Sequence, residues 1–161
     1  MHPQSGRSGP WKWLTLILFL ALVMGGGTLI GVSVPPGAWY AGLDKPWFNP
    51  PNWIFAPVWS TLYVLIAIAG WRTWRRAPTG LSMQVWFAQL ACNFAWTPVF
   101  FGMHMPGLAL VILAAMLALI VLFARLQCTP DRVSALLFVP YAAWVCFAGL
   151  LNLSIWWLNG Q

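Results

Sequence analysis

The chain has 161 residues, of which 61% are hydrophobic and only 6% charged. A water-soluble domain usually carries about a quarter charged residues, so this composition excludes a fold with a charged outer face. The net charge of +6 does not indicate nucleic-acid binding, because the basic residues lie in short breaks between apolar runs rather than in one patch. The composition indicates an integral membrane protein.

Five apolar runs are long enough to cross a bilayer core, which takes roughly 20 helical residues. In chain order they are Trp13–Val34, Pro57–Trp74, Ser82–Gly102, Gly107–Leu126 and Val133–Leu158. Breaks rich in proline and glycine separate them, and none shows the alternation of a membrane-spanning strand. The sequence therefore predicts an all-α membrane protein, a bundle of five transmembrane helices formed by one domain over residues 13–161.

Residues 1–12 are predicted to form a polar, disordered tail before the first helix. Arg7 and Lys12 followed by an apolar run could also indicate a cleaved signal peptide. However, the apolar part runs for about twenty residues, longer than a usual signal core, and no clear A-x-A site follows it. We expect a retained first helix.

The basic residues predict how the bundle is oriented. With five crossings, Lys45 falls on one side of the membrane, and the other basic residues fall on the opposite side: Arg7, Lys12, Arg72, Arg75, Arg76, Arg125 and Arg132. By the positive-inside rule, the N-terminus is expected in the cytoplasm and the loop over residues 35–57 on the far side. The same residues are expected to meet anionic lipid headgroups.

The predicted helices lack the residues that ion-coupled transport and hydrolysis need. Asp44 and Asp131 are the only acidic residues, and both are assigned to loops, so coupled pumping is not expected. No nucleophile motif or pair of carboxylates is present. No metal site is predicted, because the possible ligands are scattered along the chain: His2, His104, Cys92, Cys128 and Cys146.

Two tryptophans fall inside predicted helices rather than at the ends, where membrane tryptophans usually act as interfacial anchors. Trp96 and Trp144 could line a cavity for a flat, apolar ligand, and Asn93 could orient a polar group on that ligand. The loop over residues 35–57 is rich in proline and aromatic residues. It is predicted to form a rigid flap over the mouth of the bundle, the alternative being a loop that rests on headgroups.

Four stretches carry motifs that keep a fixed order along the chain. They are WYAGLDKPWFNPP at Trp39–Pro51, APVWSTLY at Ala56–Tyr63, QLACNFAWTPVFFG at Gln89–Gly102 and PYAAWVCFAGLLN at Pro140–Asn152. With this spacing, nearly the whole chain resembles the translocator protein family, also called tryptophan-rich sensory proteins or peripheral benzodiazepine receptors. The resemblance implies a five-helix bundle, commonly a homodimer, with a pocket beneath the first long loop that binds porphyrins and other hydrophobic small molecules.

The resemblance also implies which residues bind the ligand. By motif they are Tyr40, Pro51, Trp59, Tyr63, Asn93, Trp96, Trp144 and Ala148. The expected ligand is a porphyrin, either protoporphyrin IX or haem, and no cofactor is required. The implied function is a receptor or carrier in tetrapyrrole metabolism, sensing or transport. The alternative is a light-dependent porphyrin-degrading enzyme in which Trp59 and Trp144 take part in photo-oxidation, and a third possibility is a structural scaffold.

Other features bear on the source and on self-association. The sterol-recognition pattern of animal members is missing after Asn152, so no steroid function is carried over, and a bacterial protein is favoured. Helical spans favour the bacterial inner membrane, the alternative being the outer membrane, to which some members of the family are assigned. A GxxxG motif joins Gly27 to Gly31, and Ala91 with Ala95 forms a pair of small residues at the same spacing. Either pair could pack within one chain or between two chains, and the alanine pair is the preferred dimer face.

Overall fold

The computed structural model describes residues 11–160, all of whose regular structure is helical. Most of the predicted tail lies outside the described residues, but Trp11 and Lys12 already belong to the first helix. The elements are α1 (Trp11–Leu20), a π-helical turn (Ala21–Gly25), α2 (Gly26–Ser33), α3 (Ala38–Ala41), a 3₁₀ turn (Asn52–Ile54), α4 (Phe55–Arg76), α5 (Leu81–Thr97), a second π-helical turn (Pro98–Gly102), α6 (Pro106–Gln127) and α7 (Arg132–Leu158).

The all-helical prediction is confirmed, and four helical stretches are long and apolar enough to cross a membrane. They are Trp11–Ser33, Asn52–Arg76, Pro106–Gln127 and Arg132–Leu158. The remaining predicted run forms α5, which has 17 residues and is shorter than the other four. The loop predicted over residues 35–57 is partly helical, because it contains α3 and the 3₁₀ turn.

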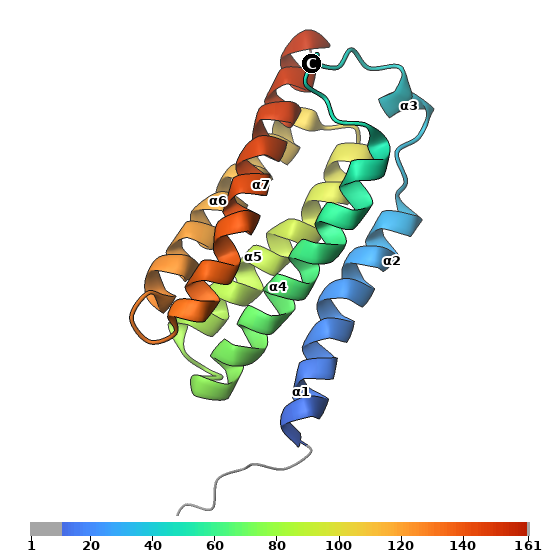
Figure 1. Cartoon of the computed structure of the whole chain (residues 1–161). Helices are drawn as coiled ribbons and strands as arrows, with labels where there is room; N and C mark the ends of the chain where they lie inside the picture. Colours follow the sequence, from blue (N-terminus) through green and yellow to red (C-terminus); the bar gives the residue numbers. More distant parts are fainter. Residues whose placement is uncertain (1–10, 161) are drawn as a thin grey trace, which may run out of the picture.

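The long helices run side by side along one common direction (Figure 1). α1 and α2 form one continuous rod at the edge of the bundle, since the backbone stays helical through the π-helical turn between them. In the most apolar part of this rod 11% of the residues are buried, against 28% in each of the other three spans. The rod is therefore the least embedded of the spans.

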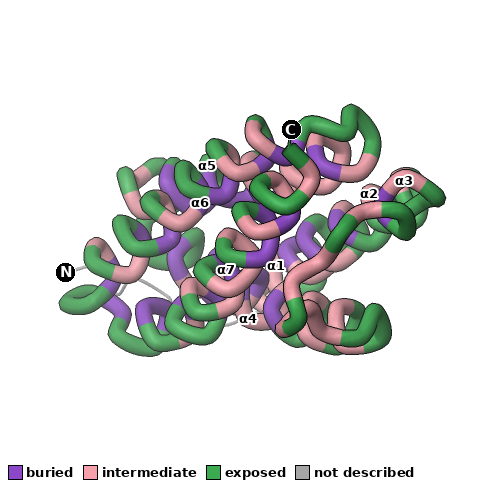
Figure 2. Tube along the Cα trace, turned by 90° about the horizontal axis from the view of Figure 1, so that it is seen from above, coloured by how far each residue is buried: buried purple, intermediate pink, exposed green. Residues whose placement is uncertain are grey.

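Large apolar side chains fill the middle of the bundle. In Figure 2 the buried residues lie mainly on the sides of the helices that face one another. Trp86 of α5 is fully buried and donates its indole N–H to the carbonyl oxygen of Ile66 at 3.0 Å. It packs against Gly70 of α4, where an added Cβ would lie 2.3 Å from the indole ring. Many leucines and valines point outward, as expected where acyl chains replace water around the protein.

An ion-pair cluster joins α4 to the start of α7 at the end of the bundle where most of the arginines lie. The Asp131 carboxylate accepts hydrogen bonds from Arg72 Nε at 3.0 Å and from Arg72 Nη2 at 2.7 Å. It also accepts one from Ser134 Oγ at 2.7 Å, and Arg76 lies 3.7 Å away. Asp131 lies in a loop, as the sequence predicts, and its side chain is only 2% exposed because α4 covers it. This cluster holds the loop between α6 and α7 against α4.

Candidate functional site

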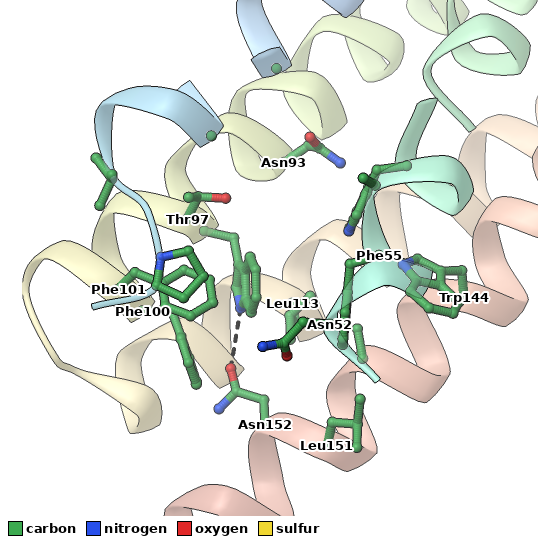
Figure 3. A pocket seen from close by; sticks show the side chains of 18 of the residues that line it. Asn52, Phe55, Asn93, Thr97, Phe100, Phe101, Leu113, Trp144, Leu151 and Asn152 are labelled. Atoms are coloured by element: carbon green, nitrogen blue, oxygen red, sulfur yellow. Dashed lines mark hydrogen bonds between the residues drawn. The ribbon is translucent and has the colours of Figure 1, made fainter. Parts of the chain in front are cut away.

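A cavity of about 730 Å³ lies between α2, α4, α5 and α7, beneath the loop that carries α3. This volume falls within the range of about 300–1,000 Å³ typical of small-molecule sites. α6 adds Leu113 and Met116 to the wall, and the loop adds Asn49 and Asn52. Figure 3 shows side chains from several helices pointing into the same space, with amide groups among the aromatic rings.

The structure brings together most of the residues that the sequence predicted to bind a ligand. Those that line this cavity are Tyr40, Trp59, Tyr63, Asn93, Trp96, Trp144 and Ala148. Pro51 does not line it and lies exposed before the 3₁₀ turn. The position of Pro51 follows from its place at the outer end of the loop, from which the chain turns back into α4.

Aromatic rings contribute two sides of the cavity. On one side, Trp96 stacks on Phe100 with ring centroids 5.2 Å apart and planes at 23°. On the other, Trp144 meets Phe55 edge to face at 5.9 Å, and Figure 3 shows both side chains next to the open space. Such walls favour flat apolar ligands, because rings stack on or meet one another edge to face.

A chain of neutral hydrogen bonds borders the cavity behind Asn93. The Asn93 amide donates to the Tyr141 hydroxyl at 2.9 Å, and that hydroxyl donates to Gln89 Oε1 at 2.9 Å. Tyr63 donates to Asn93 Oδ1 over a longer distance of 3.4 Å. Asn93 therefore makes hydrogen bonds to two other helices and also lines the cavity, where the sequence predicted that it could orient a ligand.

Replacing Tyr141 with phenylalanine is expected to lower the free energy of unfolding by about 1–2 kcal/mol. The change leaves the buried amides of Gln89 and Asn93 each short of one partner. Tyr63→Phe is the matched control, and its expected loss is smaller because the Tyr63 hydrogen bond is longer. Unfolding in mixed micelles followed by fluorescence measures both. Equal losses for the two variants would contradict this account of the network.

A second polar link fixes the other end of the cavity. The Trp96 indole N–H donates to Asn152 Oδ1 at 3.1 Å, which is the dashed line in Figure 3, and Asn152 Nδ2 donates to the Pro106 carbonyl at 2.7 Å. These bonds join α5, α7 and the start of α6. The plane of the Trp96 ring is thereby set before any ligand binds.

The Trp144 indole N–H differs from the Trp96 indole N–H because it makes no hydrogen bond among the described residues. The nitrogen is buried and has no hydrogen-bond partner among the described residues, although Trp144 lines the cavity. A buried donor without a partner costs about 1–3 kcal/mol. A ligand that carries an acceptor at this position would recover that energy.

The cavity is electrically neutral in the part of the chain that the structure describes. Its lining contains no Asp, Glu, Lys, Arg or His, and the polar groups are amides, hydroxyls and indoles. Burial raises the pKa of the Tyr40 hydroxyl more than the neighbouring Asn49 amide lowers it, so Tyr40 is neutral at physiological pH. Among residues 11–160, no three His, Cys, Asp or Glu side chains lie together as metal ligands would. The arrangement suits binding by shape and stacking.

Sequence reasoning missed the contribution of α2 and of the second π-helical turn. α2 lines the cavity with the small residues Gly27, Thr28 and Gly31, the first π-helical turn adds Met24, and the second adds Phe100 and Phe101. The run of three glycines from Gly25 to Gly27 was an available signal, because small residues allow a neighbouring helix to approach closely. The π-helical turn left no comparable pattern.

The two small-residue pairs have different surroundings. An added Cβ at Gly27 would lie 2.2 Å from the Tyr63 ring, so this end of the GxxxG motif packs within the chain. Ala91 and Ala95 lie exposed on α5 and do not line the cavity. Pairing of two chains through that face stays a prediction.

The chain is similar to proteins from bacteria, archaea and mammals. It is 39% identical to protein CrtK of Rhodobacter capsulatus, over 91% of this chain and 92% of that protein. It is 36% identical to a tryptophan-rich sensory protein of Cereibacter sphaeroides, over 91% and 92%, and 37% identical to a translocator protein of Bos taurus, over 89% of both chains. Residues 16–158 match the model of the TspO/MBR family, and the chain is therefore an integral membrane protein that belongs to this family.

Proposed function

We propose that the chain is a membrane receptor or carrier that binds a planar tetrapyrrole in the aromatic cavity. The observation that carries this proposal is the cavity itself, in which stacked rings enclose about 730 Å³ of neutral space. The flat macrocycle would lie between the Trp96 and Trp144 sides. Its polar substituents would point toward the amides of Asn49 and Asn52 in the loop.

The proposal includes five membrane crossings. α5 and the π-helical turn that follows it run without a break from Leu81 to Gly102. At about 1.5 Å per residue this stretch is long enough for a hydrocarbon core of about 30 Å. Its neighbours in the bundle are spans, so α5 would lie at the same depth as they do.

The positions of the charges in the fold support the proposed orientation. Lys12, the C-terminal end of α4 and the loop between α6 and α7 lie at one end of the bundle, and that end carries the arginines of Arg72–Arg76, Arg125 and Arg132. Lys45 lies in the loop at the opposite end. By the positive-inside rule this distribution supports an arginine-rich end, and with it an N-terminus, on the cytoplasmic side, and we propose the bacterial inner membrane as the location.

Titration of the purified protein with protoporphyrin IX, followed by tryptophan fluorescence, tests the function. The Trp59→Ala, Trp144→Ala double variant is expected to bind about tenfold more weakly, because each lost aromatic contact is worth about 0.5–1.5 kcal/mol. The Trp11→Ala, Trp13→Ala double variant is the control, since those indoles are 72% and 57% exposed at the start of α1. Unchanged affinity in the first double variant would refute a tetrapyrrole site in this cavity.

A porphyrin-degrading activity is the alternative, and it has a structural reason to be tested. Trp59 and Trp144 both line the cavity, so a bound macrocycle would lie beside two oxidisable indoles. Illumination of the complex in the presence of dioxygen would then give a new bilin-like absorbance that Trp144→Phe abolishes. Binding without any change of absorbance would leave the receptor or carrier function.

A further inference from the structure

A second hollow, of about 680 Å³, lies where α7 ends, on the outside of the bundle. Its lining comes from the loop after α3 and from the last two turns of α7: Lys45, Pro46, Trp47, Leu153, Ser154, Trp157 and Leu158. None of these residues lines the aromatic cavity, so the two hollows are separate. We call the second one the Lys45 groove.

Hydrogen bonds fix the two sides of the Lys45 groove to each other. The Asp44 backbone N–H donates to Asn159 Oδ1 at 3.0 Å, and Asn159 Nδ2 donates to the Asp44 carbonyl at 3.0 Å. Asn159 Nδ2 also donates to the Ile155 carbonyl within α7 at 2.8 Å. The loop is therefore tied to the end of the helix, and the groove between them is already formed.

The apolar part of the groove is unusually exposed. Trp47 is 95% and Trp157 is 82% exposed, the two highest values among the large hydrophobic side chains that the structure describes. Leu153 lies one turn before Trp157 on the same face of α7 and is 42% exposed. Tryptophans in such positions lie at the level of lipid headgroups, with leucines pointing toward the acyl chains.

Lys45 gives the groove a positive charge at that level. Its ammonium group donates to the carbonyls of Leu43 at 3.0 Å and Ala41 at 3.3 Å, and it lies 4.7 Å from the centre of the Tyr40 ring. An ammonium group has three N–H donors, so one remains for another partner. Lys45 takes part in no ion pair among the described residues, and its charge is therefore not neutralised by a carboxylate there.

We propose that the Lys45 groove binds one anionic phospholipid. The phosphate would accept a hydrogen bond from the Lys45 ammonium, and an acyl chain would lie along Leu153 and Trp157 toward the bilayer core. The occupant follows from the combination of a single cation, two exposed indoles and an apolar strip at one depth, which matches the headgroup and chain of a lipid. This inference does not depend on what the aromatic cavity binds.

Native mass spectrometry of the detergent-solubilised protein tests the proposal by titration with phosphatidylglycerol and phosphatidylcholine. One lysine near a membrane surface supports about a fivefold preference for the anionic lipid, and wild type is expected to show it. Lys45→Gln should lower the preference by this factor, and Lys45→Arg should keep it. Lys12→Gln is the matched control, because Lys12 also lies beside an indole, 5.3 Å from the centre of Trp13, at the other end of the bundle. Lys12→Gln should lower the preference by less than Lys45→Gln does, because the arginines at that end of the bundle remain to meet anionic headgroups.

Several results would overturn the proposal. Equal binding of the two lipids by wild type, or an equal loss of preference in Lys45→Gln and Lys12→Gln, would show that the groove is not selective. If glycerol phosphate alone competes as well as the whole lipid, the site binds free anions and the apolar strip has no part in it. If Trp157→Ala breaks a dimer and leaves lipid binding unchanged, the occupant of the groove is a second copy of the chain.

Discussion

Gly70→Ala is expected to lower the free energy of unfolding by about 2 kcal/mol, although alanine favours helix more than glycine does. The new Cβ would lie 2.3 Å from Cε2 and 2.5 Å from Cζ2 of Trp86. The indole cannot move away easily, because it is fully buried, bonded to the Ile66 carbonyl and in contact with the Phe19 ring at 5.2 Å. Equilibrium unfolding in mixed micelles measures the change.

Gly149→Ala provides the control for this substitution. Gly149 also lies inside a long helix, α7, but an added Cβ there would meet no atom within 4 Å. The expected result has the opposite sign, a gain of up to about 1 kcal/mol from helix propensity. If both substitutions changed the free energy of unfolding equally, the close contact between α4 and α5 would not explain why position 70 requires glycine.

Asp131→Asn is expected to destabilise the protein by about 2 kcal/mol at neutral pH. Burial raises the pKa of Asp131, but the hydrogen bonds from Arg72 and Ser134 and the charges of Arg72 and Arg76 outweigh it and lower the pKa to about 2. The ionised form is thus favoured in the folded state. The substitution removes that charge and leaves the two arginines without their partner.

The lowered pKa of Asp131 also determines how the stability of the wild-type protein depends on pH. Because the folded-state pKa lies below the ordinary value of 3.8, the stabilisation is present above about pH 4 and is lost as the pH falls to about 2. Wild type and Asp131→Asn should therefore converge in stability over that interval. Asp44→Asn is the control, because Asp44 is exposed and belongs to none of the described ion pairs, and it should follow wild type at each pH. A constant difference between wild type and Asp131→Asn would contradict the ion-pair account.

The positions of the helices could be predicted closely because hydrophobicity and length decide them in a membrane. The fourth run, Gly107–Leu126, differs from α6 by one residue at each end. Helix ends next to proline and arginine were equally clear, as at Arg132, where α7 begins. The length of α5 could not be read in the same way, because the run continues through a π-helical turn that has no periodic signal.

The cavity was predictable only through its aromatic motifs. Trp96 and Trp144 stood out in the sequence because they fall inside predicted helices. Only the fold shows that their indole N–H groups have different surroundings. Trp96 is bonded to Asn152, and Trp144 has no partner for its N–H. The pairing of Asp131 with Arg72 was equally hidden, since the two residues lie 59 positions apart in the chain.

The most direct test of the cavity as the ligand site is to fill it. Ala148 lines the cavity, and Ala143 lies exposed on the same helix, so Ala148→Phe and Ala143→Phe add the same ring inside and outside the site. In the fluorescence titration with protoporphyrin IX, we expect Ala148→Phe to weaken binding by about tenfold, since forcing added bulk into an occupied site costs about 1–3 kcal/mol. Ala143→Phe should bind as wild type does. Wild-type affinity in Ala148→Phe, in a protein that still unfolds cooperatively, would contradict the account.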